Sequence, residues 1–236
     1  MPTTTPLTDA INALTTYSNT VTGASDTTLS DAVATLAAGY GGGGGSEINE
    51  LADGSISGAV EITASYIRDR FLKECRYITS LSCPNITVVR EQVCSNCSGL
   101  VSVSMPNATS VNSSQQFISC TSLTTVNLPK LQTLGGNMFQ GCTALEFIDL
   151  PQATSLNATR CFYGCSNLKT IVLRYTSVVP LNNDGLTGTQ FASGGSGGTV
   201  YVPSALISSY QTASNWSTLY NAGTCTFTAI EGSPYE

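Results

Sequence analysis

The sequence contains no histidine, and only 10% of its 236 residues are charged. Histidine is the most frequent general base and a common zinc ligand, so its absence argues against acid–base catalysis and against zinc sites. No serine or cysteine has an activating partner nearby in the sequence that would make it a nucleophile. We therefore expect a protein that is not an enzyme and that holds no cofactor and no metal.

Basic residues are also scarce, and none occurs in the first 67 positions. The formal net charge is −6, whereas nucleic-acid phosphates require clustered Lys and Arg, so we expect no nucleic-acid partner. No apolar run approaches the roughly 18 residues that a membrane-spanning helix needs. The first residues do not combine a basic segment with an apolar one, as a signal peptide does. We expect neither membrane insertion nor secretion by a signal peptide.

One motif recurs through the chain, and its clearest copy is FQGCTALEFIDLP at residues 139–151. Its frame is Cys, two residues, an aliphatic residue, two residues, Ile or Val, one residue, Leu and then Pro. A period of 20 to 50 residues is typical of a solenoid, in which a short unit stacks repeatedly over a continuous core. The lead cysteines, spaced by 22 or 23 residues, are Cys75, Cys97, Cys120, Cys142 and Cys165.

Two further columns of residues keep the same period. Each coil is expected to form one short strand around the Ile/Val step of the motif, and these strands would stack in parallel into a sheet. The proline that follows has no N–H to offer and would end the strand. The two columns are Ile67, Val89, Val111, Leu134, Leu156 and Val178, and Leu72, Cys94, Phe117, Phe139 and Phe162.

Nine cysteines raise three alternatives: a reduced core column, a few disulfides, or a metal site. Five of the nine occupy one column of the repeat, where a small, weakly polar thiol suits a tight inward turn. We favour reduced core cysteines. Cys94 and Cys97 form a C-x-x-C spacing, but because they fall on two core columns we expect no redox role for them.

Phrases such as FQGCTALEFIDLP and FISCTSLTTVNLP resemble the BspA-like leucine-rich repeat family, a bacterial and phage-associated branch of leucine-rich repeats. The resemblance covers roughly residues 53–230. It implies an α/β repeat solenoid of right-handed, leucine-rich-repeat-like coils of 22–23 residues with a short parallel β-sheet, preceded by a small α-helical N-terminal segment. The front section is similar to segments that precede such repeats in phage structural proteins.

The chain divides at the glycine run of residues 41–45, which reads as a flexible linker. Residues 1–40 would form a helical attachment or oligomerisation segment, residues 46–198 the solenoid with a capping coil at 46–67, and residues 199–236 a strand–helix cap. In the cap we expect a strand at 199–202, Ser204 as the helix N-cap and Trp216 as a packing anchor rather than a ligand platform.

Two apolar stripes in the first segment would either pair with each other, pack on the solenoid, or dock on copies of the chain or on a larger assembly. The candidate attachment residues are Leu7, Ile11, Leu14, Leu29, Val33 and Leu36.

Residues that flank each core Val or Ile should point outward from the sheet, because neighbours in a strand alternate faces. The early coils place Ser, Thr and Asn there, whereas Phe147 and Asp149 depart from that pattern. They could contact a sugar or a protein, or they could be merely solvated while loops or an oligomer interface bind. The candidate ligand contacts are Phe147, Asp149, Asn127, Thr125, Lys130, Arg174 and Tyr175.

The function predicted from these features is a non-enzymatic phage virion appendage, a tail or head fibre or decoration protein. Its N-terminal helices would bind other virion proteins or copies of itself, giving a homo-oligomer. Its repeats would bind a host cell-surface protein or glycan. The alternatives are a bacterial cell-surface or secreted adhesin with an extracellular location, and a structural decoration protein that binds no receptor.

Overall fold

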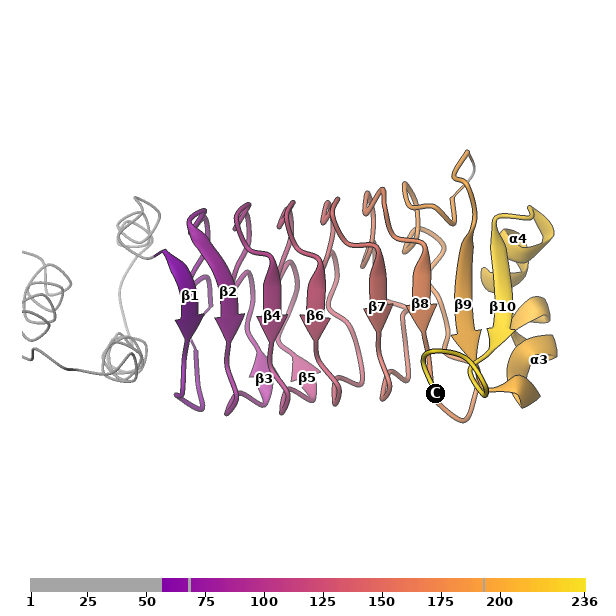
Figure 1. Cartoon of the computed structure of the whole chain (residues 1–236), viewed down its shortest axis with the longest axis horizontal. Helices are drawn as coiled ribbons and strands as arrows, with labels where there is room; N and C mark the ends of the chain where they lie inside the picture. The colour runs from indigo at the N-terminus through magenta and orange to yellow at the C-terminus, as the bar shows by residue number, and fades with distance from the viewer. Residues whose placement is uncertain (1–56, 68, 193) are drawn as a thin grey trace, which may run out of the picture.

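The structure, a computed structural model, describes residues 57–67, 69–192 and 194–236. The described part is an elongated stack of coils with a row of parallel strands along one side and helices at the C-terminal end (Figure 1). The predicted parallel solenoid of leucine-rich-repeat-like coils is confirmed. The predicted helical segment at 1–40, its attachment residues, the linker at 41–45 and residues 46–56 lie outside the described residues.

The row of strands consists of two four-stranded sheets in which every pair is parallel. The first sheet has the order β1 (Gly58–Glu61), β2 (Ile78–Ser82), β4 (Ser102–Ser104), β6 (Thr125–Asn127). The second continues with β7 (Phe147–Asp149), β8 (Thr170–Val172), β9 (Gly198–Val202), β10 (Cys225–Ala229).

Strand register follows the repeat, so equivalent residues of successive coils lie side by side. Leu81 pairs with Val103, and Val103 with Val126. In the second sheet Ile148 pairs with Ile171, and Ile171 with Val200. These side chains point inward over the core, which is why an aliphatic residue recurs at this step of every coil.

A two-stranded sheet of β3 (Val88–Val89) and β5 (Ser110–Val111) lies on another side of the stack, behind the row of strands (Figure 1). The column that passes through these strands is predicted to end at Val178, but Val178 is only half-buried and Val179 is fully buried. The last coil is longer than the others, because Leu156 bridges to Leu181. The column therefore continues at the buried Leu181, three residues beyond Val178.

The lead cysteines form a column of buried thiols in the core, and all nine cysteines are free. Four of them each donate the thiol hydrogen to a backbone carbonyl of the preceding coil. The distances are 2.9 Å from Cys97 to Leu72, 3.0 Å from Cys120 to Cys94, 3.2 Å from Cys142 to Phe117 and 3.0 Å from Cys165 to Phe139. The thiol therefore connects one coil to the next as well as filling space.

Three phenylalanines of the other core column stack as well. The rings of Phe117 and Phe139 are 5.6 Å apart with 12° between their planes, and those of Phe139 and Phe162 are 5.6 Å apart with 4°. All three rings are fully buried. Offset stacking of this kind adds about 0.5–1.5 kcal/mol per pair to the free energy gained from burial.

The coils also turn through left-handed backbone at two recurring positions, a conformation that strains residues with a Cβ. The first position is held by Arg70, Gln92, Gln115, Asn137 and Arg160, and the second by Glu74, Asn96, Ser119, Gly141, Gly164 and Gly188.

The C-terminal end of the core is covered by the 3-10 helix η2 (Ser204–Leu206) and by α3 (Ile207–Thr212) and α4 (Trp216–Asn221). Trp216 is fully buried and donates its indole N–H to the carbonyl of Val179 at 2.8 Å, as a packing anchor should. The prediction of Ser204 as N-cap is wrong: Pro203 takes that place, and the Glu231 carboxylate accepts a hydrogen bond from the Ser204 backbone N–H at 2.9 Å. That carboxylate supplies the capping group because no side chain within η2 does.

Candidate interaction surface

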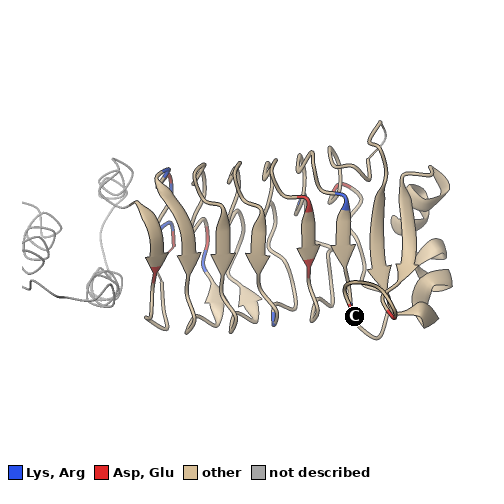
Figure 2. Ribbon diagram, in the orientation of Figure 1, with Lys and Arg blue, Asp and Glu red and all other residues tan. Residues whose placement is uncertain are grey.

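The outward face of β2, β4 and β6 carries two in-register columns of small polar side chains. Ser80, Ser102 and Thr125 form one column, and Ser82, Ser104 and Asn127 the other. Asn127 donates its amide to the hydroxyl of Ser104 at 2.9 Å. Figure 2 shows these three strands without charged residues on them. This half of the face is an open, neutral platform of hydroxyl and amide groups.

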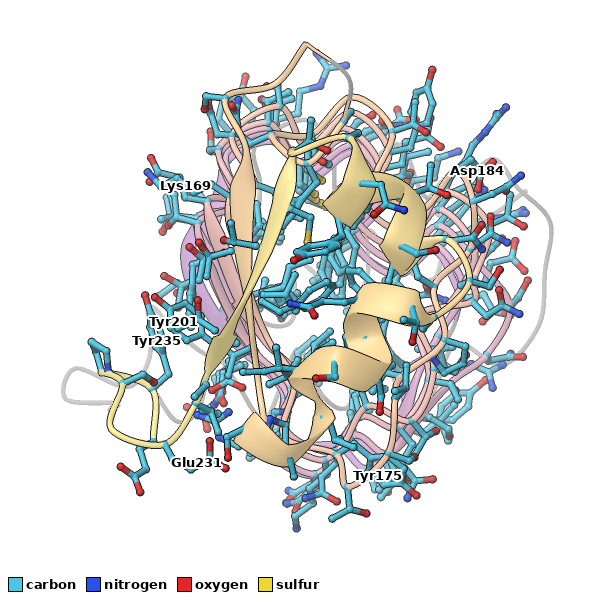
Figure 3. The ribbon with its side chains drawn as sticks, turned by 90° about the vertical axis from the view of Figure 1, so that its right-hand side faces the viewer. Lys169, Tyr175, Asp184, Tyr201, Glu231 and Tyr235 are labelled. Atoms are coloured by element: carbon cyan, nitrogen blue, oxygen red, sulfur yellow. The ribbon has the colours of Figure 1, made fainter. Side chains whose placement is uncertain are left out.

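The outward face of β7, β8 and β9 is covered by the last residues of the sequence. Figure 3 shows Tyr235 beside Tyr201 on the outer side of the sheet, where the chain loops back after β10. The Tyr235 ring stacks on Phe147 with centroids 5.2 Å apart and meets Tyr201 edge-on at 4.7 Å. Val172 lies between Asp149 and Tyr201 in register and is fully buried, as a residue under this ring would be.

Arg174 and Asp149 join this arrangement through polar contacts. The Arg174 guanidinium forms an ion pair with the Asp149 carboxylate and donates a second hydrogen bond to the backbone carbonyl of Tyr235 at 2.5 Å. Both charged side chains are 31% exposed. A guanidinium held by one carboxylate is oriented for its second acceptor, because its donors form a planar fork. We call Phe147, Asp149, Arg174 and Tyr201 the aromatic clamp.

The seven predicted ligand contacts therefore fall into three groups. Phe147, Asp149 and Arg174 come together in the aromatic clamp, and Thr125 and Asn127 lie on the open platform one strand away. Lys130 and Tyr175 lie apart from both.

Lys130 lies in the turn after β6, where its ammonium bonds the amide oxygen of Asn107 at 2.7 Å. Tyr175 packs partly buried against the core and projects away from Tyr201 and Tyr235 (Figure 3).

Sequence reasoning missed Tyr201 and Tyr235. Tyr201 could have been found, because it continues the outward column that contains Asp149 and Val172. Tyr235 could not, because it lies beyond the last repeat and no periodic pattern points to it.

Among the described residues, eight further charged side chains form ion pairs between neighbouring coils. Arg70 pairs with Glu91 at 3.2 Å, Arg90 with Asp69 at 3.0 Å, Lys169 with Glu146 at 2.7 Å, and Arg160 with Asp184 at 3.4 Å. Pairs this exposed contribute little stability each, about 0–1 kcal/mol. In the described part of the chain, these pairs occupy charges that could otherwise recognise a charged ligand.

A cavity of about 610 Å³ opens between the last coil and α4. Its lining is uncharged and includes Asn182, Gln190, Asn215 and Thr218. Three of its amides are engaged in the fold: Asn182 bonds Asn157, Gln190 bonds Ser166 and Asn215 bonds Leu181, in each case at a backbone carbonyl. This hollow therefore offers few free polar groups to a ligand.

The described residues show no grouping of three His, Cys, Asp or Glu side chains that could hold a metal ion. Burial raises the pKa of the Cys161 and Cys165 thiols to about 12, so neither is a thiolate at neutral pH. Without thiolate character a cysteine is a poor nucleophile. In the part of the chain that is described, no helix has the length and apolar character needed to cross a membrane.

Comparison with known proteins gives a family but no close relative. No curated protein matches the chain. A leucine-rich repeat protein of T. pallidum, known from a crystal structure, matches with 16% identity over 72% of this chain and 86% of its own, with a TM-score of 0.44. A leucine-rich repeat protein from Bacteroides ovatus matches with 17% identity over 61% of this chain and 55% of its own, with a TM-score of 0.30.

The repeats themselves match a family description over more than half of the chain. Residues 61–183 fit six copies of the BspA type leucine rich repeat region, the same stretch in which the strand register, the thiol column and the stacked rings repeat. The chain therefore belongs to the BspA-type leucine-rich repeat family.

Proposed function

We propose that this leucine-rich repeat protein is a non-enzymatic binding protein that contacts a host cell-surface protein or glycan through the open platform on β2, β4 and β6. The observation that supports this is the platform itself: six small polar side chains held in register and free of charge. Pairing between the strands fixes the spacing of these side chains before a partner binds. Binding therefore costs little conformational entropy of the chain.

Two substitutions on the platform test this proposal. Ser102→Arg combined with Thr125→Arg places two bulky charges on neighbouring strands, and we expect binding to intact host cells or to a glycan array to fall at least tenfold. Gln132→Arg, at an exposed position next to the bridge between Thr133 and Ser155 and outside the platform strands, is the matched control and should bind normally. If the double variant stays folded and binds like the unmodified protein, the platform is not the contact.

We further propose that the protein is part of a phage virion, as a tail or head appendage. Residues 1–40 would attach it to other virion proteins or to copies of itself. The glycine run at 41–45 would be the flexible linker between this segment and the repeats. Support comes from the sharp change of composition at the glycine run and from the two apolar stripes before it. A chain without residues 1–45 should remain folded yet fail to assemble into particles. Incorporation of that shortened chain would count against the virion role.

The bacterial cell-surface or secreted adhesin remains the alternative, with the same platform and another means of display. Labelled antibody against the repeats separates the two: staining of intact bacterial cells favours the adhesin, and staining of purified particles favours the appendage. A protein found on particles that binds neither cells nor glycans would be a structural decoration protein.

A further inference from the structure

We propose that the aromatic clamp on β7, β8 and β9 is a second binding site, which recognises an aromatic residue within a peptide segment. In the structure the chain's own residues 232–236 occupy the site as a removable cover. The site lies outside the platform of the proposed function and rests on separate contacts.

The shape of the clamp fits one aromatic ring. Phe147 and Tyr201 belong to strands two apart, and because adjacent strands lie about 4.8 Å apart, a slot of roughly twice that width separates their rows. Val172 of the intervening strand forms its apolar floor. The Tyr235 ring fills the slot, stacked on one wall and edge-on to the other. Aromatic pairs prefer these two geometries.

The polar part of the clamp selects a peptide. Arg174 donates a hydrogen bond to the backbone carbonyl of Tyr235, the residue whose ring is in the slot. The clamp therefore contacts the ring and the carbonyl of the same residue. Asp149 neutralises the guanidinium and holds its direction. The required ligand is therefore a neutral peptide unit with an aromatic side chain. A sugar could stack on Phe147 and offer Arg174 a hydroxyl or acetamido oxygen, but the tail that occupies the clamp presents a peptide carbonyl together with a planar ring.

The cover is attached to the sheet by few bonds. After the Ile230 N–H, which bonds Val202 at 2.9 Å, the next backbone bonds stay within the tail: Ser233 to Ile230 at 3.0 Å and Glu236 to Ser233 at 3.4 Å. Gly232, at a φ of 75° with open space around it, begins the tail with a residue that tolerates rotation. The Tyr235 ring in the slot and the hydrogen bond from Arg174 join residues 232–236 to the strands.

The residues in register with Phe147 on the neighbouring strands support a binding site at this position. The position of Phe147 is threonine in each of the next three strands, as Thr170, Thr199 and Thr226. A large apolar ring on an outward face costs solubility unless something covers it. Here the cover is a short segment on a glycine hinge rather than another strand.

The test uses the full-length chain with Tyr235→Ala, which empties the slot but leaves the tail backbone in place. The probe is the fluorescently labelled peptide GSPYE, which reproduces residues 232–236. We expect saturable binding to Tyr235→Ala and at least tenfold weaker binding to the unmodified chain, because a tethered ligand competes at an effective concentration on the order of millimolar. Tyr220→Ala, which removes an exposed tyrosine of α4, should behave like the unmodified chain.

Specificity is tested with changed peptides and a changed clamp. GSPFE should bind Tyr235→Ala, because the Tyr235 side chain contacts Phe147 and Tyr201 through its ring, and GSPAE should not. Adding Phe147→Ala to Tyr235→Ala should abolish binding of GSPYE. Two results would overturn the proposal: Tyr235→Ala binds GSPYE and GSPAE equally, or the unmodified chain binds GSPYE as tightly as Tyr235→Ala does.

A second variant guards against misfolding. A chain ending at Glu231 retains the carboxylate that bonds the Ser204 backbone and lacks the cover entirely. If circular dichroism shows it folded, it should bind GSPYE at least as tightly as Tyr235→Ala does. A folded chain that binds oligosaccharides but no aromatic peptide would refute the peptide assignment, whatever the platform on β2, β4 and β6 binds.

Discussion

The thiol of Cys142 donates a hydrogen bond to the backbone carbonyl of Phe117, 3.2 Å away and one coil earlier in the sequence. The same relation recurs for Cys97, Cys120 and Cys165. Because every cysteine is buried, and burial raises the pKa of the Cys120, Cys142 and Cys165 thiols, these groups should be unreactive in the folded protein. We expect a disulfide reagent such as DTNB to label at most one thiol before unfolding and all nine after it. Rapid labelling of several thiols in the folded state would contradict the buried column.

Stability should fall at alkaline pH. Burial raises the pKa of Cys161, Cys165 and Cys225 from 9.0 to about 12, whereas in the unfolded chain these thiols lose their protons near pH 9. Their contribution to stability is complete below pH 9 and is lost as the pH rises toward 12, by up to about 1.4 kcal/mol per pH unit for each thiol. Urea midpoints at pH 8, 9, 10 and 11 measure this decline. Cys165→Ala should show a shallower decline, and a flat profile in the unmodified chain would argue against protonated core thiols.

Ser119→Gly should stabilise the protein by about 0.5–1 kcal/mol, because Ser119 has a φ of 59° and glycine adopts that conformation without strain. The chain itself has glycine at this place in later coils, as Gly141 and Gly164. Ser122→Gly, three residues on and without a positive φ, is the matched control and should cost about 0.5–1 kcal/mol. Thermal midpoints of the two variants should move in opposite directions.

Gln116→Met should be tolerated although Gln116 is fully buried. The side-chain oxygen of Gln116 has no hydrogen-bond partner, and its amide bonds only the carbonyl of Asn112, at 3.2 Å. An unpaired buried oxygen costs about 1–3 kcal/mol, so its removal should offset the lost bond. The equivalent residue of the next coil is Met138, which shows that the position accommodates methionine. Chemical denaturation should give a free energy of unfolding within about 1 kcal/mol of the original, and a larger loss would indicate that the oxygen has a bound water.

The stack could be predicted from the sequence because its packing requirement is periodic. The lead cysteines and the ring column from Phe117 to Phe162 each return at a fixed interval, and their burial followed from it. The shift of this column from Val178 to Leu181 could not be predicted, because the longer last coil is defined by the bridge between Leu156 and Leu181 rather than by a sequence repeat. Periodicity specifies the residues that repeat and gives no information where one coil changes length.

The candidate site was only half predictable for a related reason. Phe147 and Asp149 stood out because they depart from the polar residues at equivalent positions. Their partner Tyr235 is 88 residues from Phe147 and outside the repeat, so no local pattern connects the two rings. The departure indicated where something packs, and the structure identified the packing partner as the chain's own tail.

Among the described strands, the hydrogen-bonded ladder is interrupted once along the row, between β6 and β7, where one four-stranded sheet ends and the other begins. The open platform lies on one side of this boundary and the aromatic clamp on the other. Backbone bonds outside the strands still join the two coils there, such as those from the Phe117 N–H to Met138 and from the Ala144 N–H to Thr121. Under tension along the long axis, however, this boundary lacks the bonds that strand pairing adds along the rest of the row. The array would then yield there first and separate into two blocks, each with its own surface intact.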